Sequence, residues 1–209
     1  SPYPNTVSSS YISIFSTIEN KVKINEGSLR PIKVIAPEGT VVNPREPAPT
    51  TLSTDSTCET IVEAGWIALA QAVPHLSQAP WNRWAAPASR GYNPRTGKMF
   101  ADIHFMSKGG GGATQGFDGW EHVGTVCCLG GLRAPDPELH ETINPYLVLN
   151  YEFLPDYAGA GQWRGGNGVH YKFQVLADNV EMAFFGSGVR EETAPCGIVG
   201  GKGAPPTSQ

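Results

Sequence analysis

Glycine is gathered in short clusters along the second half of the chain, and these clusters limit what the chain can fold into. The sequence has 25 glycines and 18 prolines among 209 residues. Because glycine weakens the interior of a helix or strand and permits tight turns, each cluster predicts a loop between regular elements. The clusters follow no fixed period, which excludes a collagen-like chain. They are Gly109–Gly112, Gly130–Gly131, Gly159–Gly161, Gly165–Gly168 and Gly200–Gly203.

Two helices are predicted in the first third of the chain. Apolar residues recur at helical spacing from Val7 to Val22, and serines give this helix another face that is small enough for close packing. The second helix is predicted from Ser56 to about Val73, because Ser56-Thr57-Cys58-Glu59 fits a capping box and Pro74 cannot continue a helix. A stripe of small and apolar residues predicts packing against a sheet or the first helix; it comprises Ile61, Gly65, Ala68, Leu69 and Ala72.

Strands are predicted mainly in the second half. An early strand at Ile32–Ala36 is followed by a turn at Pro37–Thr40. Ala177–Asn179 predicts a short hairpin loop between the last two strands of the chain. The later strands are Met99–Phe105, Thr125–Leu129, Tyr146–Phe153, Val169–Val175 and Val180–Phe185.

The order of these elements predicts an α+β fold, with two N-terminal helices packed on a predominantly antiparallel, glycine-rich β region. We divide the chain into a helix-containing segment, 1–98, and a β-rich glycine-loop segment, 99–209. The chain begins with Ser1 rather than Met. We therefore expect both segments to form one continuous part of a larger subunit.

Charge and hydropathy exclude several classes of protein. A net charge of -4 and a pI near 5.7 exclude a basic surface for nucleic acid or anionic membranes. No apolar run approaches the ~20 residues that cross a bilayer, and no signal segment opens the chain, so we expect a cytoplasmic protein. Charged residues make up 16% of the chain, against about a quarter in ordinary domains, which suggests that another chain covers part of the surface.

The four cysteines favour a structural interpretation. Cys58, Cys127, Cys128 and Cys196 contain no C-x-x-C pair, which argues against a zinc ribbon. We expect buried free thiols, because an unpaired cysteine behaves as a small hydrophobic residue.

The tetraglycine Gly109, Gly110, Gly111 and Gly112 has two explanations. Successive glycine N–H groups can converge on a phosphate or carboxylate, and Lys108 would add a positive charge. The segment matches neither a P-loop nor a dinucleotide-binding motif, and no helical pattern follows it. A mobile or close-packed loop explains the same glycines.

Several titratable residues lie within about twenty positions. Asp102 and His104 have the i, i+2 spacing that puts both side chains on one face of a strand, which suits metal coordination or a base with its orienting partner. Asp118 and His122 are four residues apart, although the glycines around them disfavour a helix. Each of these residues also has a simpler explanation as a satisfied polar side chain. The isolated histidines are interpreted as structural; they are His75, His140 and His170.

Two arginines lie in rigid turn contexts. Arg30 lies between Gly27 and Pro31, and Arg164 precedes Gly165-Gly166. A guanidinium held in this way can present its planar fork to a carboxylate or phosphate, and a buried structural ion pair, the explanation we favour, accounts for both arginines as well.

Three segments, in this order, resemble the hydantoinase B/oxoprolinase family. The first is Asn25-Glu26-Gly27-Ser28-Leu29-Arg30-Pro31 with the later Asn43-Pro44-Arg45 and Pro47-Ala48-Pro49. The second is Gly109–Gly112 with Asp118-Gly119-Trp120, and the third is Gly159–Val169, which reads GAGQWRGGNGV. The stretch Cys127–Glu141 departs from the family's usual pattern after the second segment, which leaves the substrate class open.

The resemblance implies the C-terminal part of a B-type subunit that works beside an ATP-binding hydantoinase A-type subunit. In such enzymes the partner activates a carbonyl or enolate by phosphoryl transfer, and the B-type subunit supplies a divalent metal. The metal ligands are expected in the N-terminal part of the same subunit, so no metal ligand is assigned to this chain.

Three functions follow from the resemblance. The first is ATP-dependent hydrolysis of a cyclic amide such as hydantoin, 5-oxoproline or a lactam; the second is ATP-dependent carboxylation of acetone or acetophenone. The third is a non-catalytic scaffold that holds the assembly in register. For the catalytic functions the candidate catalytic residues are Asp118, His122, Arg30 and Arg164, and the candidate cofactor-binding residues are Gly109, Gly110, Gly111 and Gly112.

Overall fold

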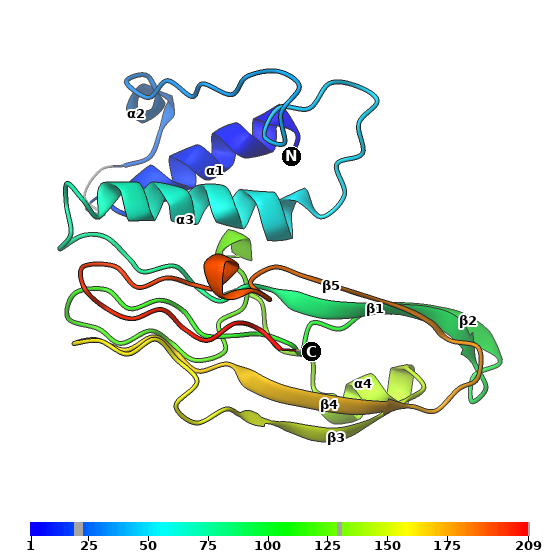
Figure 1. Ribbon diagram of the computed structural model, residues 1–209. Helices are drawn as coiled ribbons and strands as arrows, with labels where there is room; N and C mark the ends of the chain where they lie inside the picture. Colours follow the sequence, from blue (N-terminus) through cyan, green and yellow to red (C-terminus); the bar gives the residue numbers. More distant parts are fainter. Residues whose placement is uncertain (19–22, 129–130, 209) are drawn as a thin grey trace.

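A layer of helices lies over two antiparallel sheets in the computed structural model, which describes residues 1–18, 23–128 and 131–208 (Figure 1). Helices α1 (Tyr3–Phe15) and α3 (Cys58–Leu69) lie side by side above the strands, with the short helix α2 (Glu26–Leu29) next to them. Helix α4 (Pro137–Ile143) lies in the lower part, next to the sheets. Across the described ranges, every helix is too short or too polar to cross a membrane.

The contact between α1 and α3 uses the serine face of α1. Thr6, Ser9 and Ser13 are buried, and Ser9 and Ser13 donate to carbonyl groups of their own helix, so burying their hydroxyls leaves no donor unpaired. A Cβ on Gly65 would lie 2.3 Å from Ser13 Oγ. The predicted close packing of the small face is therefore correct. Helix α1 ends at Phe15, whereas the apolar pattern predicted a helix as far as Val22. Residues 16–18 are not helical, and residues 19–22 lie outside the described part of the chain.

The predicted capping box of the second helix is wrong. A π-helical turn at Ser53–Thr57 leads into α3, and no side chain caps the N-terminus of the helix. Glu59 instead points into the interior, where it is 2% exposed and accepts a hydrogen bond of 3.0 Å from the Val126 backbone. A carboxylate engaged there is not available to the helix N-cap.

Buried polar contacts join α3 to the layer beneath it. Glu63 accepts a 2.8 Å hydrogen bond from the backbone N–H of Trp81 and pairs with Arg83. Val62 and Trp66 form a small hydrophobic core with Val126, against which Ile12 and Trp81 pack. Partnered charges are therefore buried beside the apolar core of this layer.

Five strands form the two sheets. The first sheet has the order β2-β1-β5, with β1 at Ala85–Asn93, β2 at Lys98–Ile103 and β5 at Glu181–Gly186. The second pairs β3 (Tyr146–Phe153) with β4 (Val169–Val175). All pairings are antiparallel, so the predicted α+β class with antiparallel strands is correct.

Several predicted elements differ from the structure. Ile32–Ala36 forms no strand, and the described part of Thr125–Leu129 contains a short 3-10 helix at Val126–Cys128. Ala177–Asn179 connects β4 of one sheet to β5 of the other and is not a hairpin. Strand β1 and helix α4 were also not predicted. In β1 the reason is that Pro87 and Gly91 are of residue types that are rare inside strands.

Further differences concern the N-terminal segment and the cysteines. Segment 1–98 contains three α-helices rather than two among its described residues, and its strand β1 pairs with both β2 and β5 of segment 99–209. Cys58 is a buried free thiol, as expected, whereas the free thiols of Cys128 and Cys196 are exposed. The side chain of Cys127 lies outside the described part.

The glycine loops are stacked backbone against backbone. The N–H of Gly111 donates to the carbonyl of Trp120 at 2.7 Å, and the carbonyl of Gly111 accepts from the N–H of Gly166 at 2.9 Å. A Cβ on Gly110 would lie 2.1 Å from the carbonyl of Gly166. The tetraglycine is thus a close-packed loop, and the second and third family-like segments lie in direct contact.

Candidate functional site

A cavity of about 660 Å³ lies beside these loops. All four glycines of Gly109–Gly112 line it, together with parts of Gly159–Gly168. Its histidines are His75 and His170, and its aromatic lining residues are Trp81, Trp163, Tyr157, Tyr171, Phe173 and Phe184. Arg83, Lys108 and Lys202 are the cationic lining residues, and no aspartate or glutamate is found among the described residues that line the cavity.

Two of the cationic side chains already have partners. The ammonium of Lys108 donates to the carbonyl of Leu132, and burial lowers the pKa of Lys108. Arg83 pairs with Glu63, and burial likewise lowers the pKa of Arg83. The charged groups of Lys108 and Arg83 are therefore already engaged by other parts of the chain. Anion binding by these glycines stays a prediction.

Asp118 and Arg164 lie together although 46 residues separate them. Oδ1 of Asp118 accepts the backbone N–H of Arg164 at 2.7 Å, and its Oδ2 lies 3.5 Å from the guanidinium. The side chains are 48% and 73% exposed, and neither residue lines the cavity. The predicted turn at Arg164 thus presents its guanidinium to solvent beside a carboxylate.

His122 lies apart from Asp118. Its Nε2 is 2.9 Å from the hydroxyl of Tyr151 and 3.3 Å from the carbonyl of Met106. Burial lowers the pKa of His122 and raises the pKa of Tyr151 to about 12, so both side chains are uncharged at neutral pH. Arg30 is exposed at the end of α2 in the helical layer. The four candidate catalytic residues therefore form one pair and two separate positions.

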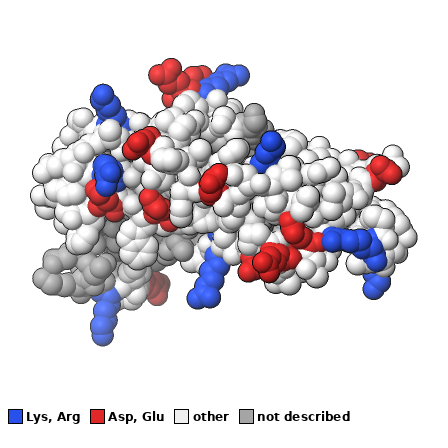
Figure 2. Space-filling model, turned by 90° about the horizontal axis from the view of Figure 1, so that it is seen from below, with Lys and Arg blue, Asp and Glu red and all other residues white. Residues whose placement is uncertain are grey.

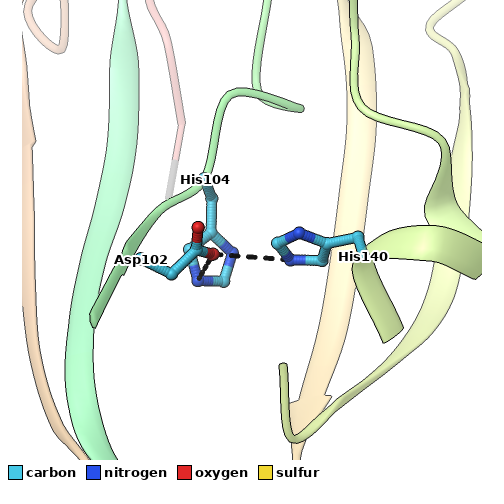
Figure 3. A group of neighbouring side chains, drawn as sticks. All are labelled: Asp102, His104 and His140. Carbon is cyan, nitrogen blue, oxygen red and sulfur yellow. Dashed lines mark ion pairs between the residues drawn. The ribbon is translucent and has the colours of Figure 1, made fainter. Parts of the chain in front are cut away.

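A second group of titratable side chains lies between the two sheets. Asp102 is on β2, His104 follows this strand directly, and His140 comes from α4 (Figure 3). Oδ2 of Asp102 is 3.5 Å from Nε2 of His104 and 3.6 Å from Nε2 of His140. His104 is completely buried, His140 is 6% exposed and the side chain of Asp102 is 20% exposed.

Neighbouring side chains hold His104 on both ring nitrogens. Its Nδ1 is 3.2 Å from the hydroxyl of Tyr171, and its Nε2 is 3.3 Å from Oγ of Ser89, which also contacts the hydroxyl of Tyr146. Burial, with a smaller effect of His140, lowers the pKa of His104 to about 4. Its imidazole is therefore neutral near neutral pH and keeps one nitrogen lone pair.

Burial also changes the protonation of the other two members. It raises the pKa of Asp102, against the attraction of His140, and lowers the pKa of His140, against the attraction of Asp102. The low polarity of this region therefore disfavours charge on all three side chains.

The sequence predicted part of this group. Asp102 and His104 share a face and lie together, as their i, i+2 spacing indicated. His140 was interpreted as an isolated structural histidine and its place in this group was missed, because no sequence pattern relates it to residues 36 and 38 positions earlier. Only the packing of α4 between the sheets brings it to Asp102.

The family model described as hydantoinase B/oxoprolinase matches residues 1–209. The chain is 33% identical over 201 residues to the caprolactamase subunit beta of Pseudomonas jessenii, which is 95% of this chain and 34% of that protein. It therefore spans about a third of the length of this relative.

Two solved structures have the same fold. The crystal structure of the ATP-dependent caprolactamase from Pseudomonas jessenii matches with a TM-score of 0.76 and 30% identity, over 91% of this chain and 34% of that one. A nucleotide-free acetone carboxylase matches with a TM-score of 0.82 over 99% of this chain and 28% of that one. At 21% identity, the second match shows the fold alone. These similarities agree with the resemblance of the three glycine- and proline-rich segments.

Proposed function

We propose, since the chain belongs to the hydantoinase B/oxoprolinase family, that it forms part of the B-type subunit of an ATP-dependent enzyme that opens cyclic amides. The observation that carries this proposal is the 33% identity to the beta subunit of caprolactamase along 95% of the chain. The matching crystal structure, also from Pseudomonas jessenii, is named an ATP-dependent caprolactamase. Hydantoin, 5-oxoproline and lactams are the proposed substrates.

The cavity offers the chemistry that such a substrate needs. A cyclic amide presents at least one carbonyl acceptor, at least one N–H donor and an apolar ring edge. Backbone groups of the glycine loops can pair with the amide, while Trp81 and Trp163 can contact the ring. Two of the three cationic lining residues already have partners and no acidic residue is found among the described residues that line the cavity, which favours a small molecule with at most one negative charge.

Partner chains are part of the proposal. An A-type subunit would bind ATP, and the N-terminal part of the B-type subunit would bind the divalent metal. On the face shown in Figure 2, charged side chains form separate groups with uncharged surface between them, and this uncharged surface supports contact with further protein. Phe117 and Trp120 are 70% and 79% exposed, and large exposed aromatic side chains are enriched where proteins meet.

The candidate catalytic residues fit this arrangement. Arg30, Asp118 and Arg164 are exposed at positions where a partner surface could complete a shared site. Asp118 orients the backbone of Arg164, and the guanidinium of Arg164 would then face an anionic group such as a phosphorylated intermediate. His122 is neutral and held by Tyr151, as a proton acceptor requires.

Ring opening by the purified complex tests the proposal. The full-length protein would be purified with its A-type subunit and supplied with ATP, Mg²⁺ and hydantoin, 5-oxoproline or caprolactam. We expect ring opening coupled to ADP release in the complex, and none with either subunit alone or without ATP. Absence of ring opening, together with ATP-dependent fixation of bicarbonate on acetone, would contradict the proposal.

The carboxylase and scaffold functions are the alternatives. The fold shared with acetone carboxylase supports the first, although the identity of 21% shows the fold alone. The scaffold function predicts that this chain is not needed for turnover itself. A complex of the A-type subunit with the N-terminal part of the B-type subunit, once assembled without this chain, would then still open the ring. Loss of turnover in point variants that still assemble would contradict the scaffold function.

A further inference from the structure

The donor atoms of Asp102, His104 and His140 converge on one point between the sheets. Oδ2 of Asp102 and the Nε2 atoms of both histidines are directed toward one another (Figure 3), and the potential ligand atoms of all three lie within 4.8 Å of one another. The residues come from β2, the segment after it, and α4, which are elements fixed by separate packing contacts.

The distances from Oδ2 of Asp102 to the two histidine Nε2 atoms are too long for hydrogen bonds and close to the distances between ligands of one metal ion. The separations of 3.5 Å and 3.6 Å exceed the roughly 2.7–3.2 Å of a nitrogen–oxygen hydrogen bond. Ligands at about 2.0–2.1 Å from a tetrahedral ion lie about 3.3 Å from each other. Octahedral geometry at similar bond lengths would bring neighbouring ligands to about 3.0 Å. The observed separations are nearer to the tetrahedral value.

Two of the three donor atoms have no other partner. Oδ2 of Asp102 and Nε2 of His140 are buried and make no hydrogen bond. Buried polar atoms are normally paired, so two unpaired atoms aimed at the same point indicate a missing group. A cation would satisfy both at once.

The surroundings hold His104 in the orientation that a ligand needs. If Nδ1–H of His104 donates to the hydroxyl of Tyr171, Nε2 keeps its lone pair, and this atom lies 3.5 Å from Oδ2 of Asp102 and 3.3 Å from Oγ of Ser89. The rings of Tyr146 and Phe173 pack at 4.7 Å and 4.6 Å from the ring of His104 and limit its rotation. Asp102 is partly exposed, which leaves a path for an ion to enter.

We propose that Asp102, His104 and His140 form a tetrahedral Zn²⁺ site in this chain, with a fourth position for water. Two imidazoles and one carboxylate suit zinc, whereas Mg²⁺ and Ca²⁺ prefer all-oxygen ligands. The carboxylate offsets one of the two positive charges. The site joins β2, the segment after it and α4 through a single ion, and it goes beyond the proposed function because the resemblance assigned no metal ligand here.

Metal content of folded variants tests the site. The full-length protein would be purified, treated with a chelator, titrated with Zn²⁺ and assayed for bound zinc. Because the rest of the subunit is proposed to hold a metal of its own, the informative quantity is the difference between variants. We expect D102N and H140Q to bind one equivalent of zinc less per chain than the unaltered protein. The matched control, H170A, removes an exposed histidine of β4 and should bind as much as the unaltered protein.

A second measurement keeps the test independent of folding. Far-UV circular dichroism would establish that D102N is folded, which its nearly isosteric change favours. Zinc should raise the thermal midpoint of the chelated unaltered protein by more than that of D102N, and Mg²⁺ should not reproduce this difference. Equal zinc content and equal zinc-induced shifts in the folded variants would overturn the proposal and leave a metal-free polar cluster. Preferential binding of Fe²⁺ over Zn²⁺ at this position would overturn the zinc assignment.

Discussion

Glu59, in the first turn of α3, accepts a hydrogen bond of 3.0 Å from the backbone N–H of Val126, which lies 67 residues later in the chain. This contact joins the helical layer to the loop region beneath it. It buries a carboxylate whose Oε2 has no partner. Burial raises the pKa of Glu59 to about 8; Asp55 adds to the effect, and Arg83 and the Val126 hydrogen bond oppose it.

The raised pKa of Glu59 predicts a stability that falls with pH. The folded state holds this proton more tightly than the unfolded state, whose carboxyl has a pKa near 4.5. The contribution of Glu59 is therefore fully present below about pH 4.5 and is lost as the pH rises to about 8. E59Q keeps an acceptor for Val126 and removes the titration. We expect the two proteins to be similar in stability at pH 5, and E59Q to be more stable at pH 8.

Urea denaturation at several pH values checks this prediction. The quantity to compare is the difference in unfolding free energy between E59Q and the unaltered protein. A difference that does not change between pH 5 and pH 8 would show that Glu59 is ionised in the folded protein.

The contact between Gly65 and Ser13 predicts a paired effect on stability. Alanine normally stabilises a helix interior by about 1 kcal/mol over glycine. At Gly65 the added Cβ would meet both Oγ and Cβ of Ser13, at 2.3 Å and 2.4 Å. We expect G65A to lower the free energy of unfolding by about 1–3 kcal/mol.

A double variant is the control for this contact. S13G removes the opposing side chain, so the combination of S13G with G65A should cost less than the sum of the two single changes. Denaturation of all four proteins measures the coupling. Additive effects would mean that the two helices separate without cost at this point.

The stacked glycine loops predict that replacing Gly110 by alanine destabilises the protein far more than replacing Gly168. In G110A the new methyl would meet the backbone of Gly166, which only a shift of the whole loop can relieve. We expect a loss of at least about 3 kcal/mol. In the control, G168A, the methyl has its nearest contact at 3.7 Å and the backbone lies outside the left-handed region, so a change within about 1 kcal/mol is expected. Thermal unfolding of both variants separates these outcomes, and equal losses would contradict the packing described here.

The exposed pair of Asp118 and Arg164 predicts that stability and turnover respond differently. An ion pair at the surface contributes about 0–1 kcal/mol, so R164A should unfold nearly as the unaltered protein does. D118A also removes the acceptor of a backbone N–H and should cost about 0.5–1.5 kcal/mol more, whereas D118N retains an acceptor.

Turnover in the complex then tests the proposed role of Arg164. If its guanidinium faces a shared site, R164A lowers ATP-dependent ring opening without changing the thermal midpoint or the assembly of the complex. Unchanged turnover and assembly would remove Arg164 from the site.

The amino-acid sequence by itself determined the local elements and the family. Strict alternation of apolar residues predicted β4 at its observed bounds, since side chains on opposite faces of a strand meet different surroundings. Other apolar segments predicted β3 at its observed bounds, and β2 and β5 to within two residues. The glycine segments predicted loops and carried the resemblance to hydantoinase B proteins. These properties depend on residues that are near one another in the chain.

Only the tertiary structure decided the partners of these elements. Strand β5 pairs with β1 instead of with β4, and β1 is a strand despite Pro87 and Gly91 because it lies between two partners. Glu59 is buried under α3 instead of capping it, and His140 reaches Asp102 only because α4 packs between the sheets. Each of these outcomes depends on contacts between residues far apart in the chain, which periodicity along a single element does not record.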